Sequence, residues 1–528
     1  METITKLIFL ILVIGAVSTN GAVKGSRPRP TPAPRPTPPL RADIGSSYSN
    51  SKVPYAVDGP AVMLALGYPG VDTAAVGYGD FNGDGIPDVV FGNSSGEPTG
   101  SPIVIALGQP GGFYIDGTTQ VISGEVPVPV SARKILVADF NQDGWPDIFV
   151  VDFGIDAPPF SGNHNWLLLS DGTGHLVYQN ALAAIEPVGS HHTATAGAID
   201  HSGHIDIFAQ GPLYFLLNDG QGHFTVDTTR LPLSLLDALS SELIDIDYDG
   251  NLDLIIEGWQ GAPGALTEIF WGNGTGFYSD ADKTVLPGDA EFWNVYDIDA
   301  EDINHDGLRD LVITRTTGGS GGFYFQMLMQ TSRRVFADES LPRLIHDRNT
   351  WIGNNGDPVY WIRLVDVTGD GEPDIVYDGA GTGGSSRLLG WANDGNGYFT
   401  FTGGWLTAIW TTPIIGDTFS PPAPGTYSYD VNWDKPVDPA SVQPTDLTLS
   451  GIQGATVTGV TVINDNFTTE FTLDIPTGGS LTTSIAAGAI TSQSGQPNVA
   501  FSGSYPVSPW TPRPSPTPRP HPTPPPRP

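Results

Sequence analysis

Cysteine is absent from this 528-residue sequence. Its absence excludes disulfide bonds, cysteine-based zinc sites and cysteine nucleophiles. A protein of this length that leaves the cell without disulfides needs another means of stabilising its fold, and bound metal ions are the obvious candidate.

Basic residues are scarce. There are 23 lysines and arginines against 57 aspartates and glutamates, which gives a formal net charge of −34. Affinity for nucleic acid comes mainly from lysine and arginine on phosphates, and anionic membranes attract the same residues. We therefore expect no nucleic-acid partner and no binding to an anionic membrane surface.

Long apolar runs are also rare. One run covers residues 7–17, follows Lys6 and is followed by small residues. It is too short to span a bilayer, and its flanks are typical of a secretory signal, although a membrane anchor is the alternative interpretation. We predict a signal peptide at 1–22, no integral membrane segment in the mature chain, and a secreted or cell-surface location.

Proline is concentrated at the two ends of the chain, in residues 23–45 and 508–528. Such composition favours extended segments without a packed core. We predict a disordered linker at the first of these and a disordered tail at the second.

One acidic motif recurs throughout the middle of the chain. The pattern Asp-x-(Asp/Asn)-x-Asp-Gly-x-x-Asp begins at residues 80, 139, 245 and 302, and again at 366 with Thr in the third position. Oxygen donors at alternate positions, a glycine and a closing acid are what a hard cation such as Ca²⁺ needs from a short loop. We predict about five Ca²⁺ ions. A decayed copy at 198–206 has Ala198 and Ser202 in place of two acids, so we expect no ion there, or a weakly bound one.

The motif belongs to a longer repeat. Its six copies begin at intervals of 47 to 64 residues, and an apolar strand comes before and after most of them. A hairpin with a Gly-rich turn follows, as in 167–178 and 215–227. Asp-Gly and Asn-Gly turns between apolar runs indicate hairpins, so each unit is predicted to have about four strands. A period of this length is typical of a propeller or a similar array.

These features resemble the FG-GAP/VCBS repeat, the blade unit of integrin α-subunit propellers. The resemblance implies an all-β fold, with a six- or seven-bladed β-propeller of four-stranded blades over residues 50–410. A seventh blade would pair 53–67 with 405–410. The resemblance also implies that a backbone carbonyl at position 7 of each loop joins the side-chain oxygens of positions 1, 3, 5 and 9. The predicted ligands are Asp80, Asn82, Asp84, Ile86 and Asp88; Asp139, Asn141, Asp143, Trp145 and Asp147; Asp245, Asp247, Asp249, Asn251 and Asp253; Asp302, Asn304, Asp306, Leu308 and Asp310; and Asp366, Thr368, Asp370, Glu372 and Asp374.

Residues 411–507 differ from the repeats. The segment that begins at Val431 and the alternating strands at 457–462 and 470–475 resemble bacterial Ig-like domains. This resemblance implies one small β-sandwich.

The sequence says least about function. No catalytic set of residues is complete, and we expect no catalytic residue and no organic cofactor. His191, His192, His201 and His204 are interpreted as exposed polar surface, because no zinc motif surrounds them. We predict a binding or adhesion protein for an extracellular protein or glycan. A hydrolase of polysaccharide or phosphoester and a structural envelope component are the alternatives.

Overall fold

The computed structural model describes residues 73–507 together with a few residues between 57 and 68. It leaves gaps at 94–97, 110–113, 159, 233, 236–238, 258–265, 290–291, 317–323, 345–360, 378–388, 404–425, 434, 464–465 and 467. The predicted signal peptide, linker and tail lie outside the described residues.

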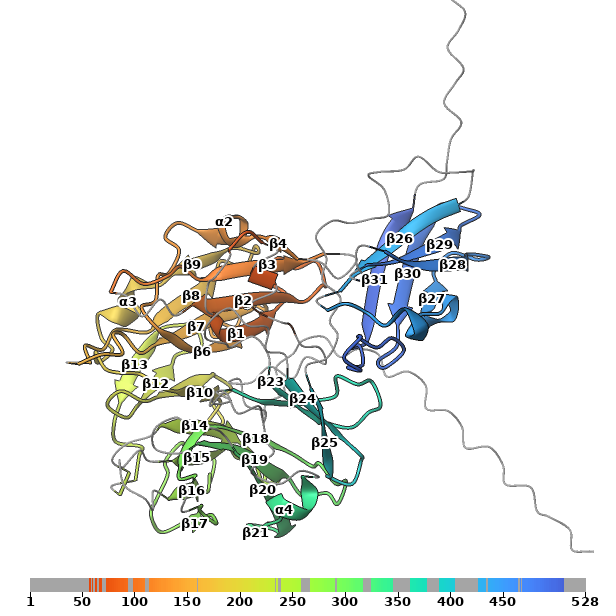
Figure 1. Cartoon of the computed structure of the whole chain (residues 1–528). Coiled ribbons are helices and arrows are strands. Elements are labelled where there is room, and N and C mark those ends of the chain that lie inside the picture. The colour runs from red at the N-terminus through yellow and green to blue at the C-terminus, as the bar shows by residue number, and fades with distance from the viewer. Residues whose placement is uncertain are drawn as a thin grey trace, which may run out of the picture. The chain divides into compact units, whose positions relative to one another are not determined.

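Residues 73–403 form six antiparallel sheets that follow one another along the chain (Figure 1). The strands of each sheet are hydrogen-bonded in chain order, which confirms the predicted four-stranded units. The second sheet has a fifth short strand, β5 (Ile122–Ser123), which runs parallel to β9. The strands are β1 (Thr73–Gly79), β2 (Asp88–Asn93), β3 (Val104–Gly108) and β4 (Tyr114–Asp116); β6 (Ala132–Ala138), β7 (Asp147–Asp152), β8 (Trp166–Ser170) and β9 (Leu176–Tyr178); β10 (Ala194–Gly197), β11 (Asp206–Ala209), β12 (Tyr214–Asn218) and β13 (Phe224–Asp227); β14 (Ser240–Ile244), β15 (Asp253–Glu257), β16 (Thr267–Phe270) and β17 (Lys283–Val285); β18 (Asn294–Glu301), β19 (Asp310–Thr316), β20 (Tyr324–Ser332) and β21 (Val335–Asp338); and β22 (Arg363–Val365), β23 (Asp374–Tyr377), β24 (Leu389–Asn393) and β25 (Phe399–Gly403).

The apolar core of this region lies between consecutive sheets. Leu136 and Phe149 of the second sheet, for example, belong to one buried cluster with Ile207 and Leu216 of the third. Similar clusters join the first sheet to the second, and so on to the sixth. Because a neighbouring sheet covers each face, the second strands are buried along their whole length and read as continuous apolar runs instead of alternating ones.

A buried lysine joins inner strands of several sheets. The ammonium group of Lys134 on β6 pairs with Glu242 on β14 and lies 3.4 Å from Asp297 Oδ1 on β18. It also lies 5.6 Å from the centre of the Trp361 ring, just before β22. Burial by itself lowers the pKa of Lys134, but the two carboxylates outweigh it, and the pKa is raised. The lysine is therefore charged and paired.

The first and sixth sheets are also in contact. Trp361 Nε1 donates a hydrogen bond to the carbonyl oxygen of Ala74 at 3.0 Å, across 287 residues of sequence. The guanidinium of Arg363 lies 4.5 Å from the centre of the Tyr78 ring on β1. These contacts bring the two ends of the repeat region together.

One expected strand contains helical residues. In the segment 53–67, which was expected to form part of a seventh blade, Val62 and Met63 are helical, and their carbonyls accept from the N–H groups of Leu66 and Tyr68. Both side chains pack onto the first sheet with Val89, so the apolar pattern reflects a helical turn on the sheet. The proposed partner strand, 405–410, lies outside the described residues.

Three short helices were not predicted from the sequence: α2 (Thr118–Val121), α3 (Asn180–Ala183) and α4 (Ser340–Arg343). No helix in the described part of the chain is long and apolar enough to cross a membrane.

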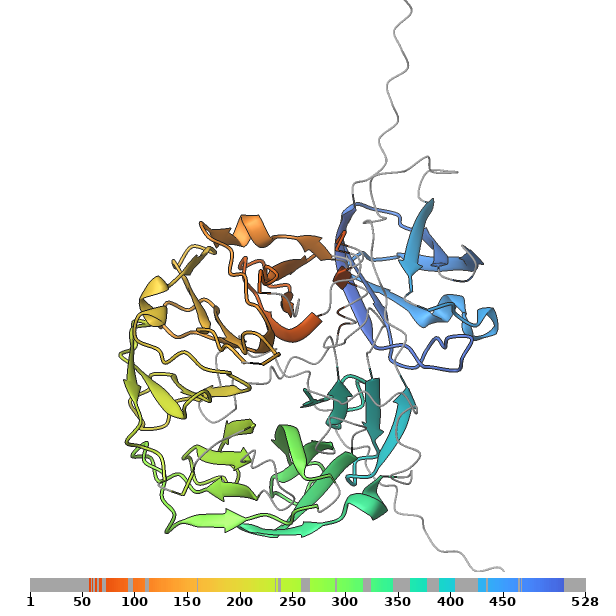
Figure 2. The same ribbon diagram turned by 60° about the vertical axis from the view of Figure 1, so that its left-hand side comes forward.

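The C-terminal region contains two three-stranded antiparallel sheets, with strand orders β26-β29-β28 and β27-β30-β31 (Figure 2). Val431 and Phe471 of one sheet share a buried apolar cluster with Leu447, Leu481 and Ile485 of the other. Two short 3₁₀ helices, η1 (Pro439–Ser441) and η2 (Pro444–Asp446), precede β27. The strands are β26 (Thr426–Asn432), β27 (Leu447–Ser450), β28 (Thr456–Ile463), β29 (Thr468–Asp474), β30 (Gly479–Ile485) and β31 (Phe501–Val507).

Candidate metal centres

Each acidic loop connects the first and second strands of its sheet. In the first sheet, Asp80 follows the end of β1, and Asp88, which begins β2, pairs in register with Gly79. The other copies have the same placement, so all five closing acids lie inside a sheet and are fully buried. The sheets thus hold position 9 rigidly, while positions 1 to 8 form the turn.

The turn is wound around its first carboxylate. The two oxygens of Asp80 accept hydrogen bonds from the backbone N–H groups of Gly83, Asp84 and Gly85 at 2.8–3.1 Å. Gly85, at position 6, has a φ of +81°, a conformation that glycine adopts without strain. Its equivalents in the other four loops have φ between +86° and +95°, which explains the glycine at this position of the motif.

Positions 3, 5 and 7 continue the same pattern. In the first loop, Asn82 Oδ1 accepts from the N–H of Asp84, whose own Oδ1 accepts from the N–H of Ile86 at 2.8 Å. The N–H groups of the other predicted carbonyl ligands, Trp145, Asn251, Leu308 and Glu372, also donate to the acid at position 5, at 2.9–3.0 Å. The loop hydrogen bonds therefore orient the side-chain oxygens before any ion binds.

Burial disfavours the charged form of the closing acids at position 9. Burial raises the pKa of Asp253 to about 8 and that of Asp88 to about 7, against the opposing effect of backbone N–H donors. Burial likewise raises the pKa of Asp147 and Asp310 to about 7 and that of Asp374 to about 6. The Oδ2 atom of Asp310 is buried without a hydrogen-bond donor. A bound cation would satisfy these carboxylates in their charged form.

The loop at 245–253 brings three carboxylates together. Oxygens of Asp245, Asp247 and Asp253 all lie within 4.8 Å of one another. Ca²⁺–oxygen distances are 2.3–2.6 Å, so two oxygens on one ion are at most about 5 Å apart. Among the acids and histidines that the structure describes, no other three meet this criterion. The other four complete loops have Asn or Thr at position 3, and their acids at positions 1, 5 and 9 do not all come within this distance of one another.

The decayed loop keeps only part of the arrangement. Burial raises the pKa of Asp206, at position 9, to about 7, and its Oδ2 has no hydrogen-bond donor. At position 3, Asp200 Oδ2 lies 3.7 Å from an Nη atom of Arg230. Asp200 thus has a guanidinium close by.

Successive loops contact one another through position 4, which the sequence did not single out. A Cβ atom on Gly83 would lie 2.4 Å from the ring of Trp145 in the next loop. The remaining contacts are Gln142 Nε2 donating to the Gly203 carbonyl at 2.8 Å, His201 with Asn251 at 2.9 Å, the Arg309 guanidinium 4.7 Å from the centre of the Tyr248 ring, and His305 with Glu372. All these position-4 residues have positive φ.

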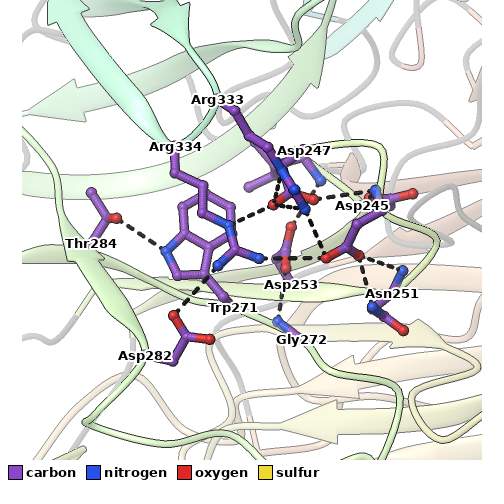
Figure 3. A network of polar contacts seen from close by, with 12 residues as sticks. Asp245, Asp247, Asn251, Asp253, Trp271, Gly272, Asp282, Thr284, Arg333 and Arg334 are labelled. Atoms are coloured by element: carbon purple, nitrogen blue, oxygen red, sulfur yellow. Dashed lines mark hydrogen bonds and ion pairs between the residues drawn. The ribbon is translucent and has the colours of Figure 1, made fainter.

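The sequence pattern also did not identify two arginines beside the loop at 245–253. Arg333 and Arg334 lie in the turn between β20 and β21 and bind Asp247 (Figure 3). They also bind Asp249. They follow the loop by more than 80 residues, so local patterns do not connect them. Two signals were available: this is the only Arg-Arg pair in the sequence, and among the five complete loops only 245–253 has Asp at position 3.

The interpretation of the four histidines as exposed surface was wrong for His191. This residue is fully buried, its ring contacts the Gln210 carbonyl, and it packs edge-on against Tyr214. Burial and the nearby Arg133 lower the pKa of His192 to about 3. His201 is exposed, as expected.

Comparisons with known proteins support the repeat. Residues 80–150, which include the first two acidic loops, match the FG-GAP-like repeat family. No curated protein gives a match. Among solved structures, the crystal structure of the V. cholerae biofilm matrix protein Bap1 aligns with a TM-score of 0.27 and 12% sequence identity, over 88% of this chain and 71% of that chain. This overlap is too loose to transfer either an arrangement of domains or a function.

Proposed function

We propose that residues 73–403 are a six-bladed, Ca²⁺-stabilised β-propeller that acts outside the cell as a binding or adhesion protein for a protein or glycan partner. The observation that carries the calcium part is the recurrence, in five repeats, of one loop geometry in which backbone N–H groups wind around the acid at position 1 and the acid at position 9 is buried in the sheet. One such loop alone would be weak support, but five at the same place in successive sheets argue for a common ligand.

Two observations support closure of the six sheets into a ring. The hydrogen bond from Trp361 to Ala74 joins the last sheet to the first. Lys134 reaches from the second sheet to carboxylates of the fourth and fifth, which requires their inner strands to converge. A closed ring also covers the outer faces of the first and last sheets, which would otherwise expose apolar surface.

The proposed ions are structural. The oxygens of positions 1, 3, 5, 7 and 9 would hold one ion in each of the five loops, with Thr368 as a weaker donor in the last. When bound, Ca²⁺ neutralises carboxylates that repel one another and cross-links the first and second strands. The chain's own contribution is the hydrogen-bonded turn and the buried acid at its end.

The remaining parts of the chain are assigned by the same proposal. Residues 1–22 direct secretion, the proline-rich ends act as spacers, and the two C-terminal sheets form an Ig-like domain. We propose no catalytic role for the protein.

The calcium proposal is tested by counting ions. Purified mature protein, equilibrated with Ca²⁺ and passed through gel filtration, should retain about five ions per chain in elemental analysis or native mass spectrometry. Absence of bound calcium at millimolar concentration would refute it.

The binding proposal is tested by a glycan array and by pull-down from extracellular fractions, each in Ca²⁺ and in EGTA. A partner retained only in Ca²⁺ supports it. Failure to retain any partner in Ca²⁺, or hydrolase activity that maps to an acid outside the loops, would contradict it.

A further inference from the structure

Loop 245–253 differs from the other four complete loops at position 3. There it has Asp247, where the others have a neutral Asn82, Asn141, Asn304 or Thr368. The Asp247 side chain is fully buried. The loop therefore gathers four carboxylates at ligand positions, and burial of such a group without a partner is costly.

The turn between β20 and β21 supplies a partner from the next sheet. Arg334 Nε lies 2.5 Å from Asp247 Oδ2, and an Nη atom of Arg333 lies 2.9 Å from the same oxygen. The two guanidinium groups also reach Asp249 Oδ2, at 3.1 and 3.4 Å.

This arginine pair is held in place. The Arg334 guanidinium stacks on the Trp271 ring, 4.4 Å from its centre, and pairs with Asp282 at 3.4 Å. The Arg334 backbone has a φ of +66°, which turns the chain so that both arginines face the loop. A third arginine, Arg309, donates to the Asp245 carbonyl at 2.6 Å.

The four other complete loops have no such compensation. In the described part of the chain, their acids at side-chain ligand positions make no ion pair with lysine or arginine. The one parallel is the decayed loop, where Arg230 lies beside Asp200 and two ligands have been lost. A guanidinium thus occurs where one loop has lost its ligands and where another carries an extra charge.

We propose that Arg333 and Arg334 set the ion affinity of loop 245–253. Positive charge from the chain keeps this loop folded without an ion and makes it the weakest of the five Ca²⁺ sites. The inference rests on the proposed calcium binding. Like charge close to a bound cation weakens its binding, and the pairing also stabilises the ion-free state against which binding competes.

The test compares the full-length protein with its R333Q/R334Q variant by Ca²⁺ titration and by thermal melting in EGTA and in Ca²⁺. We expect the variant to melt lower than wild type in EGTA and to gain more from Ca²⁺, with one site binding about tenfold more tightly, a typical effect of charge near a site. R133Q, which removes the ion pair with Asp156 outside the acidic loops, is the control, and its melting temperature should rise on adding Ca²⁺ by as much as that of wild type.

Adding D247N to the double variant removes the acid that loses its partner. This triple variant has the neutral residue that the other complete loops have at position 3. Its melting temperature in EGTA should therefore recover toward wild type. If the double variant fails to fold, the triple variant is compared with wild type in its place. If wild type and the double and triple variants have identical ion affinities and identical calcium-dependent shifts in melting temperature, the role proposed for the arginines is overturned, while the proposed calcium binding stands. Wild-type protein that binds no calcium would instead overturn the proposed function.

Discussion

The acidic loops share a motif but divide into two groups, according to whether an arginine from another part of the chain pairs with their acids. Within the described residues, the ligand acids of loops 80–88, 139–147, 302–310 and 366–374 pair with no lysine or arginine. Loops 198–206 and 245–253 have arginines supplied from elsewhere in the chain. The difference shows that a motif alone does not decide the charge that surrounds a loop. The residues that reach it from distant sequence decide as well.

The largest effect is expected at the buried Lys134, which pairs with two buried acids. Replacing Lys134 by Met leaves Glu242 and Asp297 buried without their cation, and breaking a buried ion pair costs about 3–5 kcal/mol. Chemical denaturation should show this loss equally in EGTA and in Ca²⁺, because no loop is touched. K283M, at a partly exposed lysine, is the control and should cost at most about 1 kcal/mol. A K134M loss that calcium restores would show that the two kinds of pairing are not independent.

The next effect separates the two groups of loops directly. D143N removes one charged ligand from an uncompensated loop, while D200N alters the same kind of residue beside Arg230 in the decayed loop. The calcium-dependent part of the unfolding free energy should fall in D143N by up to about 2.7 kcal/mol at a hundredfold excess of Ca²⁺ over its Kd. In D200N it should not change. Equal losses in the two variants would mean that the decayed loop binds an ion too.

The pH dependence should have opposite signs without and with calcium. Burial raises the pKa of Asp88 and Asp147 to about 7 and that of Asp253 to about 8, above their values in the unfolded chain. The stability linked to these groups is therefore present in acid and is lost as the pH rises through 7 to 8. In EGTA, lowering the pH from 8.5 to 6.5 should raise the melting temperature by about 2–4 °C.

In saturating Ca²⁺ the same change should lower the melting temperature, because ligands must be deprotonated to bind the ion. This window lies above the ordinary pKa of histidine, so His192, whose pKa is lowered, contributes little to it. A melting temperature that falls with acidification in both conditions would contradict the assignment of these acids.

The smallest effect concerns contact between successive loops. Gly83 and Gly369 both occupy position 4, with φ of +74° and +79°, so alanine strains the backbone at either by about 1–2 kcal/mol. Only at Gly83 would the new methyl group meet a neighbour, the ring of Trp145; at Gly369 nothing lies within 4 Å. G83A should therefore unfold more easily than G369A in thermal melts. Equal effects would show that the two loops do not support each other.

The sequence predicted the four-stranded units and the position of every acidic loop, because both depend on local patterns. Apolar runs, Asp-Gly turns and the glycine at position 6 are each determined by residues within a few positions of one another. The buried pair of Lys134 with Glu242 spans 108 residues, and the contacts of Arg333 and Arg334 with Asp247 span 86 and 87 residues. Such long-range pairs depend on how the sheets pack, and no local pattern contains that information.

The expected strand at 53–67 shows a second limit. Its apolar residues suit either a strand or a helical turn laid on a sheet, and over so short a run periodicity does not distinguish them. Packing of Val62 and Met63 onto Val89 favours the helical turn.

The most direct test of the account is the melting temperature of the mature full-length protein, measured in millimolar Ca²⁺ and again after EGTA treatment. Four uncompensated loops and one weaker site predict a clear drop on chelation, which added Ca²⁺ reverses. A melting temperature that chelation leaves unchanged would contradict the central claim that these loops are built around a divalent ion.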